Sequence, residues 1–413
     1  MRLFKLEIKR VLKSRRALVL LAVAMVFSVL MAYLPISFEG VNRPNEDGTV
    51  TELDGFAAIE YKRNLYATTY GEVTHEKVKE ALITYQNCVK EYGSVDGEDF
   101  PLEVNIEKIL PIRPLLKGVS EAFADPITGI GADLMDVDPN EVEQHYYEKC
   151  SEHLNDVMRN EQKNHPAAQQ KASDKYAEVD KPFQLYAGMS KDAFDYINLY
   201  ILILAILCVA IAAPIFSNEY QTGADSILRA TKYGRTRLAV TKISASCMIF
   251  ILSFILGMVV HLLILNIAFG TDCLKTSFQM LFSIINLSNL NLGQLQIIVA
   301  LAGLLSVLAS ISCTLFISAK CRDSLTAMLI SLVIVLLPMF AYTALGATWV
   351  SSILPSAGIG MQNNFFYQLA NFNYLHIGGM SFWTPYVILI SAAIEIPVFL
   401  FLAVRTYCKH QVV

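Results

Sequence analysis

The chain has 413 residues, of which 54% are hydrophobic and only 17% carry charge. It contains 33 basic and 37 acidic residues, so its formal net charge is −4. This composition excludes an ordinary soluble globular protein, and nothing in the charge balance predicts a nucleic-acid partner. We therefore expect a membrane protein.

The N-terminus is basic and amphipathic. Its apolar residues recur at helical spacing and its basic residues fall largely on the opposite face, which predicts a helix over residues 1–16 that lies on lipid headgroups. An ordinary basic anchor would give the same topology. The apolar run that follows, 17–34, lacks an Ala-x-Ala cleavage pattern and is predicted to be a retained first span rather than a signal peptide.

Further apolar stretches follow along the chain. A helix needs about 20 apolar residues to cross a bilayer, and no stretch shows the alternation of a barrel strand. The fold class is therefore an all-α polytopic membrane protein with six transmembrane helices. The predicted spans are Ala17–Leu34, Tyr196–Phe216, Ile243–Phe269, Leu295–Ala319, Leu325–Ala347 and Tyr386–Val404.

Residues 35–195 are long enough to form a domain between the first and second spans. Thr74 is positioned to cap a helix that runs to Tyr92, and Asp138-Pro139 is positioned to open a second helix. A last helix is predicted to start near Ser190 and to continue into the second span. We expect a mostly helical domain.

The charge of the domain 35–195 is acidic, with 31 acidic against 16 basic residues. Such an excess fits either cationic ligands or a solvated surface. Cys88 and Cys150 both lie on apolar helix faces of this domain. They could form a disulfide in an oxidising exterior, or remain two buried free thiols.

Basic residues set the orientation. The segments 1–16, 217–242, 319–324 and 405–413 together hold 16 basic and four acidic residues. The positive-inside rule places these segments in the cytoplasm, with both termini, and the domain 35–195 outside the cell.

Several chemistries are absent from the sequence. It contains no Gly-x-x-x-x-Gly-Lys-Ser/Thr loop, no Cys-x-x-Cys pair, no His-Glu-x-x-His and no Gly-x-Ser-x-Gly. The histidines of residues 35–195 lack the spacing of a metal site. We expect neither an enzyme nor a bound cofactor or metal in this chain.

Two polar residues fall inside predicted spans. Glu395 lies near the middle of the last span, where an unpaired carboxylate costs about 2.5–3.5 kcal/mol on insertion scales. It could face a substrate path or a proton site, or it could form a hydrogen bond between helices, with His261 as a candidate partner.

The charged segment 217–242 separates the second and third spans. Asn218 and Glu219 could cap a short helix through Leu228, with the acidic group at its positive end, and Gly223 would allow a bend or a close approach. Arginines in this segment could bind carboxylates of a soluble partner through forked donors. Some of these cations could instead only satisfy the positive-inside rule.

The same segment resembles a known family. Phe216–Gly223, followed by Ile227-Leu228, Gly234-Arg235 and Lys242, resembles the first cytoplasmic loop of ABC type-2 transporter permeases. The order Thr-Gly, the Ile-Leu pair and the absence of Pro before the Arg are departures from the family pattern. The layout of the chain is also similar, and the uncharged loop 348–385 resembles the family's helical hairpin that re-enters the outer leaflet.

The resemblance implies a permease subunit of an exporter for a peptide, drug or lipid-like substrate. It would be driven by a separate ABC ATPase subunit, which binds ATP and Mg²⁺, and would pair with an identical or related permease in the lipid membrane. The residues that the resemblance assigns to ATPase coupling are Glu219, Gly223, Leu228, Arg229, Arg235 and Lys242.

Two other functions stay open at this point. One is an ABC-linked sensor or resistance module, whose outer domain would bind an antimicrobial peptide without transporting it. The other is an intramembrane enzyme that would use Glu395 and His261.

Overall fold

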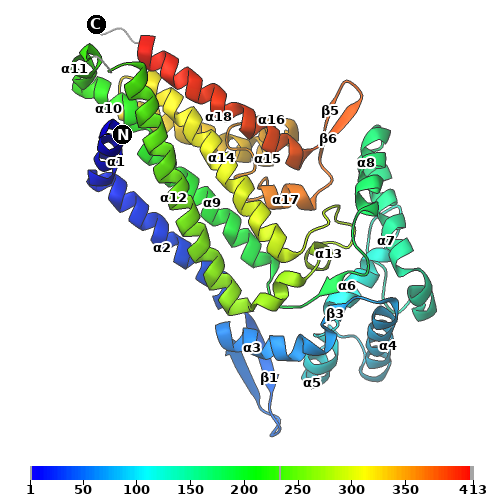
Figure 1. Cartoon of the computed structure of the whole chain (residues 1–413). Helices are drawn as coiled ribbons and strands as arrows, with labels where there is room; N and C mark the ends of the chain where they lie inside the picture. The colour runs from blue at the N-terminus through cyan, green and yellow to red at the C-terminus, as the bar shows by residue number, and fades with distance from the viewer. Residues whose placement is uncertain (1, 232–233, 410–413) are drawn as a thin grey trace.

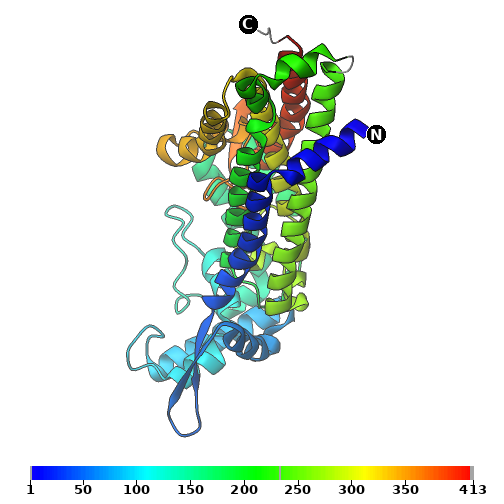
Figure 2. The ribbon, with the colours of Figure 1, turned by 90° about the vertical axis from the view of Figure 1, so that its left-hand side faces the viewer.

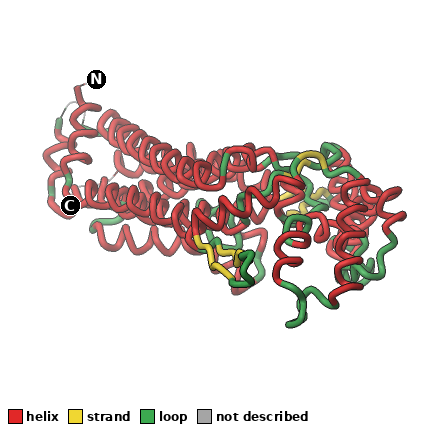
Figure 3. Tube along the Cα trace, turned by 90° about the horizontal axis from the view of Figure 1, so that it is seen from below, coloured by secondary structure: helices red, strands yellow, loops and turns green. Residues whose placement is uncertain are grey.

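Residues 2–231 and 234–409 are described by the structure, a computed structural model. It consists of a bundle of long helices and a separate smaller domain, the distal domain, formed by residues 38–190 (Figure 1). The first helix and the end of the last helix lie together at one end of the bundle, the terminal end. The distal domain lies at the opposite end (Figure 3).

Two helices open the chain, α1 (Arg2–Lys13) and α2 (Arg15–Ser37). Ser14 separates them and caps α2, with its hydroxyl accepting a hydrogen bond from the Ala17 amide (3.4 Å). The two helices meet at a wide angle, so α1 projects sideways from the bundle (Figure 2). Leu3 and Val11 of the expected apolar face pack against the core, and Lys5 and Lys9 of the basic face are exposed, which agrees with the expected amphipathic helix.

The distal domain is mainly helical, with two small antiparallel sheets. In one sheet Asn42 pairs with Glu52, and in the other Gly71 pairs with Leu185. Its elements are β1 (Gly40–Pro44), β2 (Val50–Asp54), α3 (Gly55–Tyr66), η1 (Ala67–Thr69), β3 (Gly71–Glu72), α4 (His75–Tyr92), α5 (Leu102–Val104), η2 (Asn105–Ile109), α6 (Arg113–Ala122), α7 (Pro139–Glu161), α8 (Pro166–Ala177) and β4 (Gln184–Leu185).

The predicted helix starts in this domain are confirmed. Thr74 caps α4, and its hydroxyl accepts from the Lys77 amide. Asp138 caps α7, which has Pro139 at its first position. The helix predicted to start near Ser190 is α9, which begins at the next residue and runs on into the bundle. These boundaries follow from local capping chemistry, which a sequence displays directly.

The bundle contains six helices that are long and apolar enough to cross a membrane, counted over the described residues. The six-span prediction is confirmed. Each helix starts before its predicted apolar core, and the fifth ends at Leu345, two residues before its predicted end. The bundle elements are α9 (Lys191–Ala212), α10 (Pro214–Thr222), α11 (Ala224–Ala230), α12 (Thr236–Phe269), η3 (Thr271–Lys275), α13 (Phe278–Leu281), α14 (Leu292–Lys320), α15 (Ser324–Leu345) and α18 (Thr384–Lys409).

Helices α9 and α14 form the interior of the bundle. In each of these two spans, 61% of the most apolar stretch is buried inside the protein. In the other four spans, the corresponding stretch is 22–39% buried. Small and hydroxyl residues let α14 approach its neighbours closely. The outer faces of α2, α12, α15 and α18 carry exposed Leu, Ile, Val and Phe, as a surface in contact with lipid requires.

The segment between α15 and α18 was expected to be a helical hairpin, and the structure corrects this in part. It forms two short helices, α16 (Thr348–Ile353) and α17 (Phe365–Ala370), followed by a β-hairpin of β5 (Tyr374–Ile377) and β6 (Met380–Trp383). The turn of the hairpin is Gly378-Gly379, and both glycines have positive φ. Two residues of this kind are typical of a tight hairpin turn, so the signal was present in the sequence.

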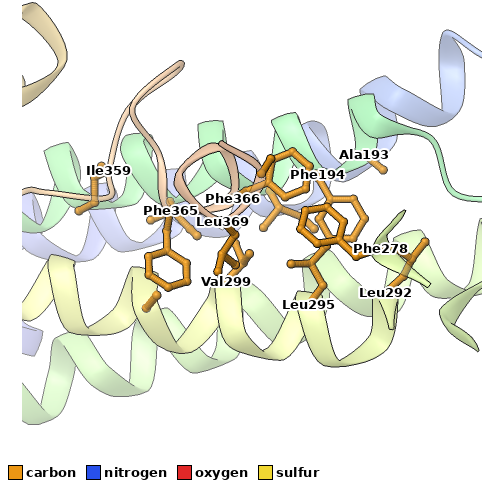
Figure 4. Packing of buried hydrophobic residues seen from close by; sticks show 14 of the residues in the cluster. Ala193, Phe194, Phe278, Leu292, Leu295, Val299, Ile359, Phe365, Phe366 and Leu369 are labelled. Carbon is orange, nitrogen blue, oxygen red and sulfur yellow. The ribbon is translucent and has the colours of Figure 1, made fainter. Parts of the chain in front are cut away.

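This segment is attached to both parts of the molecule. Phe366 of α17 stacks on Phe194 of α9 at 5.1 Å between ring centroids, and α17 packs beside Val299 of α14 (Figure 4). The β-hairpin contacts α8 of the distal domain, where the Lys171 ammonium donates to the Ser381 carbonyl (2.7 Å). The β-hairpin thus lies outside the spans and joins the distal domain to the bundle.

Candidate functional site

The predicted charged segment 217–242 is largely helical in the structure. Helix α9 gives way to α10 at Pro214, whose ring nitrogen has no hydrogen to donate to the preceding turn. Gly223, at φ +68°, separates α10 from α11 in a left-handed conformation that favours glycine. Helix α12 already begins at Thr236, so Lys242 lies inside a helix rather than at the end of a loop.

A serine on α14 stabilises the junction of α9 and α10. The Ser318 hydroxyl accepts hydrogen bonds from the Phe216 amide (3.0 Å) and the Ser217 amide (3.2 Å), and it donates to the Ala213 carbonyl (2.5 Å). All of these groups are buried. Because a buried backbone group without a partner is costly, Ser318 fixes where α10 leaves the line of α9.

Glu219 lies within α10 and is completely buried. One of its carboxylate oxygens, Oε1, accepts from the Lys242 ammonium of α12 and from the Arg10 guanidinium of α1 (2.7 Å). Glu7 lies 3.7 Å from Arg10 and completes the group. These four residues, the buried charge cluster, contain two acids and two bases, so their charges balance.

The buried charge cluster joins three helices through one carboxylate. The side chains of Glu219 and Lys242 are 0% and 1% exposed, whereas that of Arg10 is 45% exposed. Burial by itself lowers the pKa of Arg10, but the hydrogen bond and the charge of Glu219 outweigh it and raise this pKa. Breaking a buried ion pair costs about 3–5 kcal/mol because the remaining charge is left without a partner.

The structure corrects the predicted capping role of Asn218 and Glu219. Helix α10 starts at Pro214, and the residue before α11 is Gly223, so neither side chain lies at a helix N-terminus. Glu219 is instead in the middle of α10, with its side chain pointing into the protein. Helix α10 follows α9 after a single residue, so the helical pattern of the sequence runs on from the second span. For this reason the sequence does not show that α10 starts at Pro214.

Helix α11 is held against the end of the last span. The Arg229 guanidinium donates to the Cys408 carbonyl (3.1 Å) and lies 5.6 Å from the centre of the Tyr407 ring. Tyr407 also packs against Phe216 (5.0 Å between centroids). Leu228 is half-buried on the same side. Arg229 is therefore engaged within the chain.

Other described residues of this region are exposed. Ile227 of α11 is 75% exposed, and Gly223 and Arg235 are also exposed. Of the six predicted coupling residues, Glu219 and Lys242 are thus buried and paired, while Leu228 and Arg229 are half-buried. Residues 410–413, the end of the predicted cytoplasmic segment 405–413, lie outside the described residues.

Arg10 was not predicted as a site residue. It belongs to the basic face of the N-terminal helix, which predicts contact with lipid headgroups. Its partner Glu219 is 209 residues away in the chain, and nothing local marks the pairing. In the sequence, only the positive charge of Arg10 is compatible with its pairing with Glu219.

The two intramembrane polar residues do not meet, so the alternative in which Glu395 forms a hydrogen bond with His261 is excluded. The His261 ring nitrogen Nδ1 is 3.1 Å from the Ser28 carbonyl of α2, and its ring stacks on that of Tyr200 (5.3 Å). Glu395 is half-buried on α18, and its Oε2 is buried without a hydrogen-bond partner in the described part of the chain. His261 is therefore a packing residue between spans.

The disulfide alternative is also corrected. All eight cysteines are free, and both thiols in question are buried. Cys88 packs with Phe100 and Ile109, whereas Cys150 belongs to the main hydrophobic cluster. Burial raises the pKa of the Cys150 thiol, so it is packed in its neutral form. No group of three or more His, Cys, Asp or Glu arranged for a metal occurs among the residues that the structure describes.

Comparison with known families decides the identity of this fold. Residues 1–403 match the model of a family described as ABC-2 family transporter protein. The chain belongs to this family. No curated protein matches the chain significantly.

The ABC-2 family assignment confirms the resemblance seen in the charged segment. The protein is an ABC-2 transporter permease and a membrane protein. A permease of this family is the transport component in the membrane and is not itself catalytic. The segment α10–α11 with the buried charge cluster is the charged connection between the second and third spans of this permease.

Proposed function

We propose that this ABC-2 permease is the membrane subunit of an exporter driven by a separate ATPase that docks on α10 and α11. The terminal end would face the cytoplasm and the distal domain the exterior, as the distribution of basic residues favours. Exposed Lys5 and Lys9 of α1 would contact lipid headgroups. A second, identical or related permease would complete the transporter.

One observation carries this proposal: α10 is joined to α1 and α12 by the buried charge cluster. Glu219 and Lys242 are both fully buried, so α10 cannot move without moving α12 or separating buried charges. A force applied by a partner to α10–α11 would therefore pass into the spans. This gives Glu219 and Lys242 a role as a rigid connection rather than as a docking surface.

The docking surface would be the exposed residues of the same region. Ile227 is a large apolar side chain, 75% exposed, on a helix at the end of the bundle. Such a residue is suited to an apolar pocket of a partner. Arg235 is exposed nearby in sequence and could bind a carboxylate through its forked donors, while Gly223 allows close backbone approach.

The experiment is co-purification of the permease with its ATPase and measurement of ATP hydrolysis. We expect Ile227→Asp to weaken the association by at least about tenfold, as for a central apolar contact residue. Val50→Asp, at a comparably exposed apolar residue of the distal domain, is the matched control and should have no effect. A permease that neither binds nor stimulates any ATPase would contradict the proposal.

The transported molecule would be a peptide, drug or lipid-like compound, and Glu395 is a candidate residue on its path. Its carboxylate is half-buried in α18 with one unpartnered oxygen. If Glu395 contributes to transport, Glu395→Gln should reduce efflux while leaving ATPase binding unchanged. Normal efflux in this variant would exclude such a role.

The sensor or resistance module remains the second candidate. The size of the distal domain favours it, because about 150 residues outside the spans exceed what a connection between two helices needs. A sensor would bind its ligand on the distal domain without moving it across the membrane. Direct measurement of efflux from vesicles that contain the permease and its ATPase separates the two functions.

A further inference from the structure

The distal domain contains a cavity of about 510 Å³ between α4, α6 and the loops that follow them. Cavities of about 300–1,000 Å³ are typical of sites for small molecules. Tyr85, Ile109, Leu116 and Leu134 supply apolar walls. Helices α4 and α6, which line the cavity, lie at the opposite end of the molecule from α10 and α11 (Figure 1).

Charged side chains line the same cavity. Arg113 and Lys117 lie one helical turn apart on α6, and Asp96 comes from the loop after α4. Arg113 and Asp96 are exposed, and within the described part of the chain neither has an ion-pair partner. The cavity therefore offers an unpaired guanidinium and an unpaired carboxylate together with an apolar surface.

The loop 124–131 extends the apolar surface beyond the cavity. The Asp125 carboxylate accepts hydrogen bonds from the Ile127 amide (3.0 Å) and from the Thr128 amide (2.7 Å), which gives the loop a fixed shape. Ile127 and Ile130 are 84% and 69% exposed at its tip. Two large apolar side chains held in water beside a cavity are suited to contact with an amphiphilic molecule.

We propose that this cavity binds a short peptide-like ligand with a free carboxylate, a free amine and bulky apolar side chains. Arg113 would bind the carboxylate through its forked donors, which match the geometry of that group. Asp96 would bind the amine, and the apolar side chains would lie against Tyr85, Leu116 and Leu134. The cavity volume limits the enclosed part to a few residues.

Helix α6 also connects the cavity to the bundle. The Lys117 ammonium donates to the Phe282 carbonyl (2.8 Å), and the Glu121 carboxylate accepts from the Ser283 hydroxyl and the Ile284 amide (3.2 Å). These three partners belong to the connection between α12 and α14. A ligand that shifts α6 would therefore act on two spans, and this transmission step, unlike the binding step, rests on the proposed function.

The binding step is tested by calorimetry on the full chain in lipid nanodiscs, without ATPase. The probe is the tripeptide Phe-Leu-Phe, and its C-terminal amide and N-acetyl forms are the comparison ligands. We expect saturable binding of the free peptide with a Kd below about 1 mM, and a loss of about tenfold when the carboxylate is amidated.

Variants test whether Arg113 binds the carboxylate of the peptide and Asp96 its amine. Arg113→Gln should weaken the free peptide by about tenfold and remove the difference between acid and amide. Asp96→Asn should weaken the free peptide but not the N-acetyl form. Arg159→Gln, at a 70% exposed arginine of α7 outside the cavity, is the matched control and should bind as the unchanged protein does.

Two results would overturn the proposal. One is the absence of saturable binding of all three ligands; the other is full binding and unchanged acid-to-amide discrimination in Arg113→Gln, with its thermal unfolding normal. Binding without any change in partner ATPase activity would refute only the transmission step. Failure of ATPase docking would leave the binding result standing, so the two proposals are tested separately.

Discussion

Different interactions hold together two regions of the molecule. One is the terminal end of the bundle, and the other is the contact between the bundle and the distal domain. At the terminal end, Glu219 and Lys242 are buried and joined by charge, with Arg10 at the edge. At the other end, α8 and the β5–β6 hairpin meet through half-buried His165, Lys175 and His376 and the buried Trp383. There the rings of His165 and His376 stack at 3.4 Å, and Lys175 lies over Trp383 (4.9 Å).

This difference has a physical consequence. Exposed ion pairs and cation–π contacts contribute about 0–1 kcal/mol each, whereas separating a buried ion pair costs about 3–5 kcal/mol. A displacement of α10 at the terminal end would therefore either carry α12 with it or separate buried charges. Separating α8 from the hairpin at the stacked histidines and at Lys175 costs less than separating the buried pair.

The largest expected effect is at Lys242. Lys242→Met leaves the fully buried Glu219 with only a half-exposed partner, and we expect a loss of about 3 kcal/mol of stability. Thermal unfolding in detergent measures it, and Lys320→Met, at an exposed lysine of α14, is the control. The double variant Glu219→Gln with Lys242→Met should recover part of the loss. A Lys242 variant as stable as the control would show that the charges are not buried together.

An intermediate effect is expected at Arg10. Its side chain is 45% exposed, so solvent screens its interaction with Glu219, and Arg10→Gln should cost about 1 kcal/mol. The variant should also loosen α1, which hydrogen exchange of residues 2–13 would detect. Lys9→Gln, at an exposed neighbour, should change neither quantity. A loss as large as that of the Lys242 variant would place Arg10, rather than Lys242, as the main partner of Glu219.

The smallest expected effect is the pH dependence of the contact between α8 and the hairpin. Burial, and then the neighbouring His165, lower the pKa of His376. Because the folded pKa lies below the unfolded one, the unfolded chain takes up the proton first as the pH falls. The stability that depends on neutral His376 is therefore present above the ordinary histidine pKa of about 6.5 and decreases below it.

The size of this effect is under about 1 kcal/mol because the ring is partly exposed. Hydrogen exchange of residues 166–177 and 374–383 at about pH 7.5 and pH 5.5 measures it. His376→Gln should remove the difference between the two pH values, while His145→Gln, in an exposed pair on α7, should leave it unchanged. Equal exchange at both pH values in the unchanged protein would contradict a pH-sensitive contact.

The sequence predicted the elements that depend on short-range signals. Thr74 and Asp138 mark helix starts because the capping residue is adjacent to the helix that it caps, and Ser190 directly precedes α9. The spans follow from the length of uninterrupted apolar runs. The Gly378-Gly379 turn was present in the sequence but was attributed to a helical hairpin, because the family resemblance suggested one.

The sequence predicted which segment contains the site, but not how its side chains are arranged. The segment 217–242 contains Glu219 and Lys242, yet the sequence placed them on a surface, whereas both are buried. Their burial depends on side chains from α1 and α12 that meet α10 only in the folded protein. The same reason explains why the sequence left open a hydrogen bond between Glu395 and His261. Both lie in spans, but on helices that face different neighbours.

The sequence alone determined that this protein is an all-α membrane protein with six spans, a helical domain between the first two, and a charged segment typical of ABC-2 permeases. Composition, apolar run length and capping act over a few residues, so they can be read along the chain. Only the tertiary structure decided which charges are buried together, which thiols are apart and where the distal cavity forms. Those features join residues that are up to about 200 positions apart, and no local pattern records which of them meet.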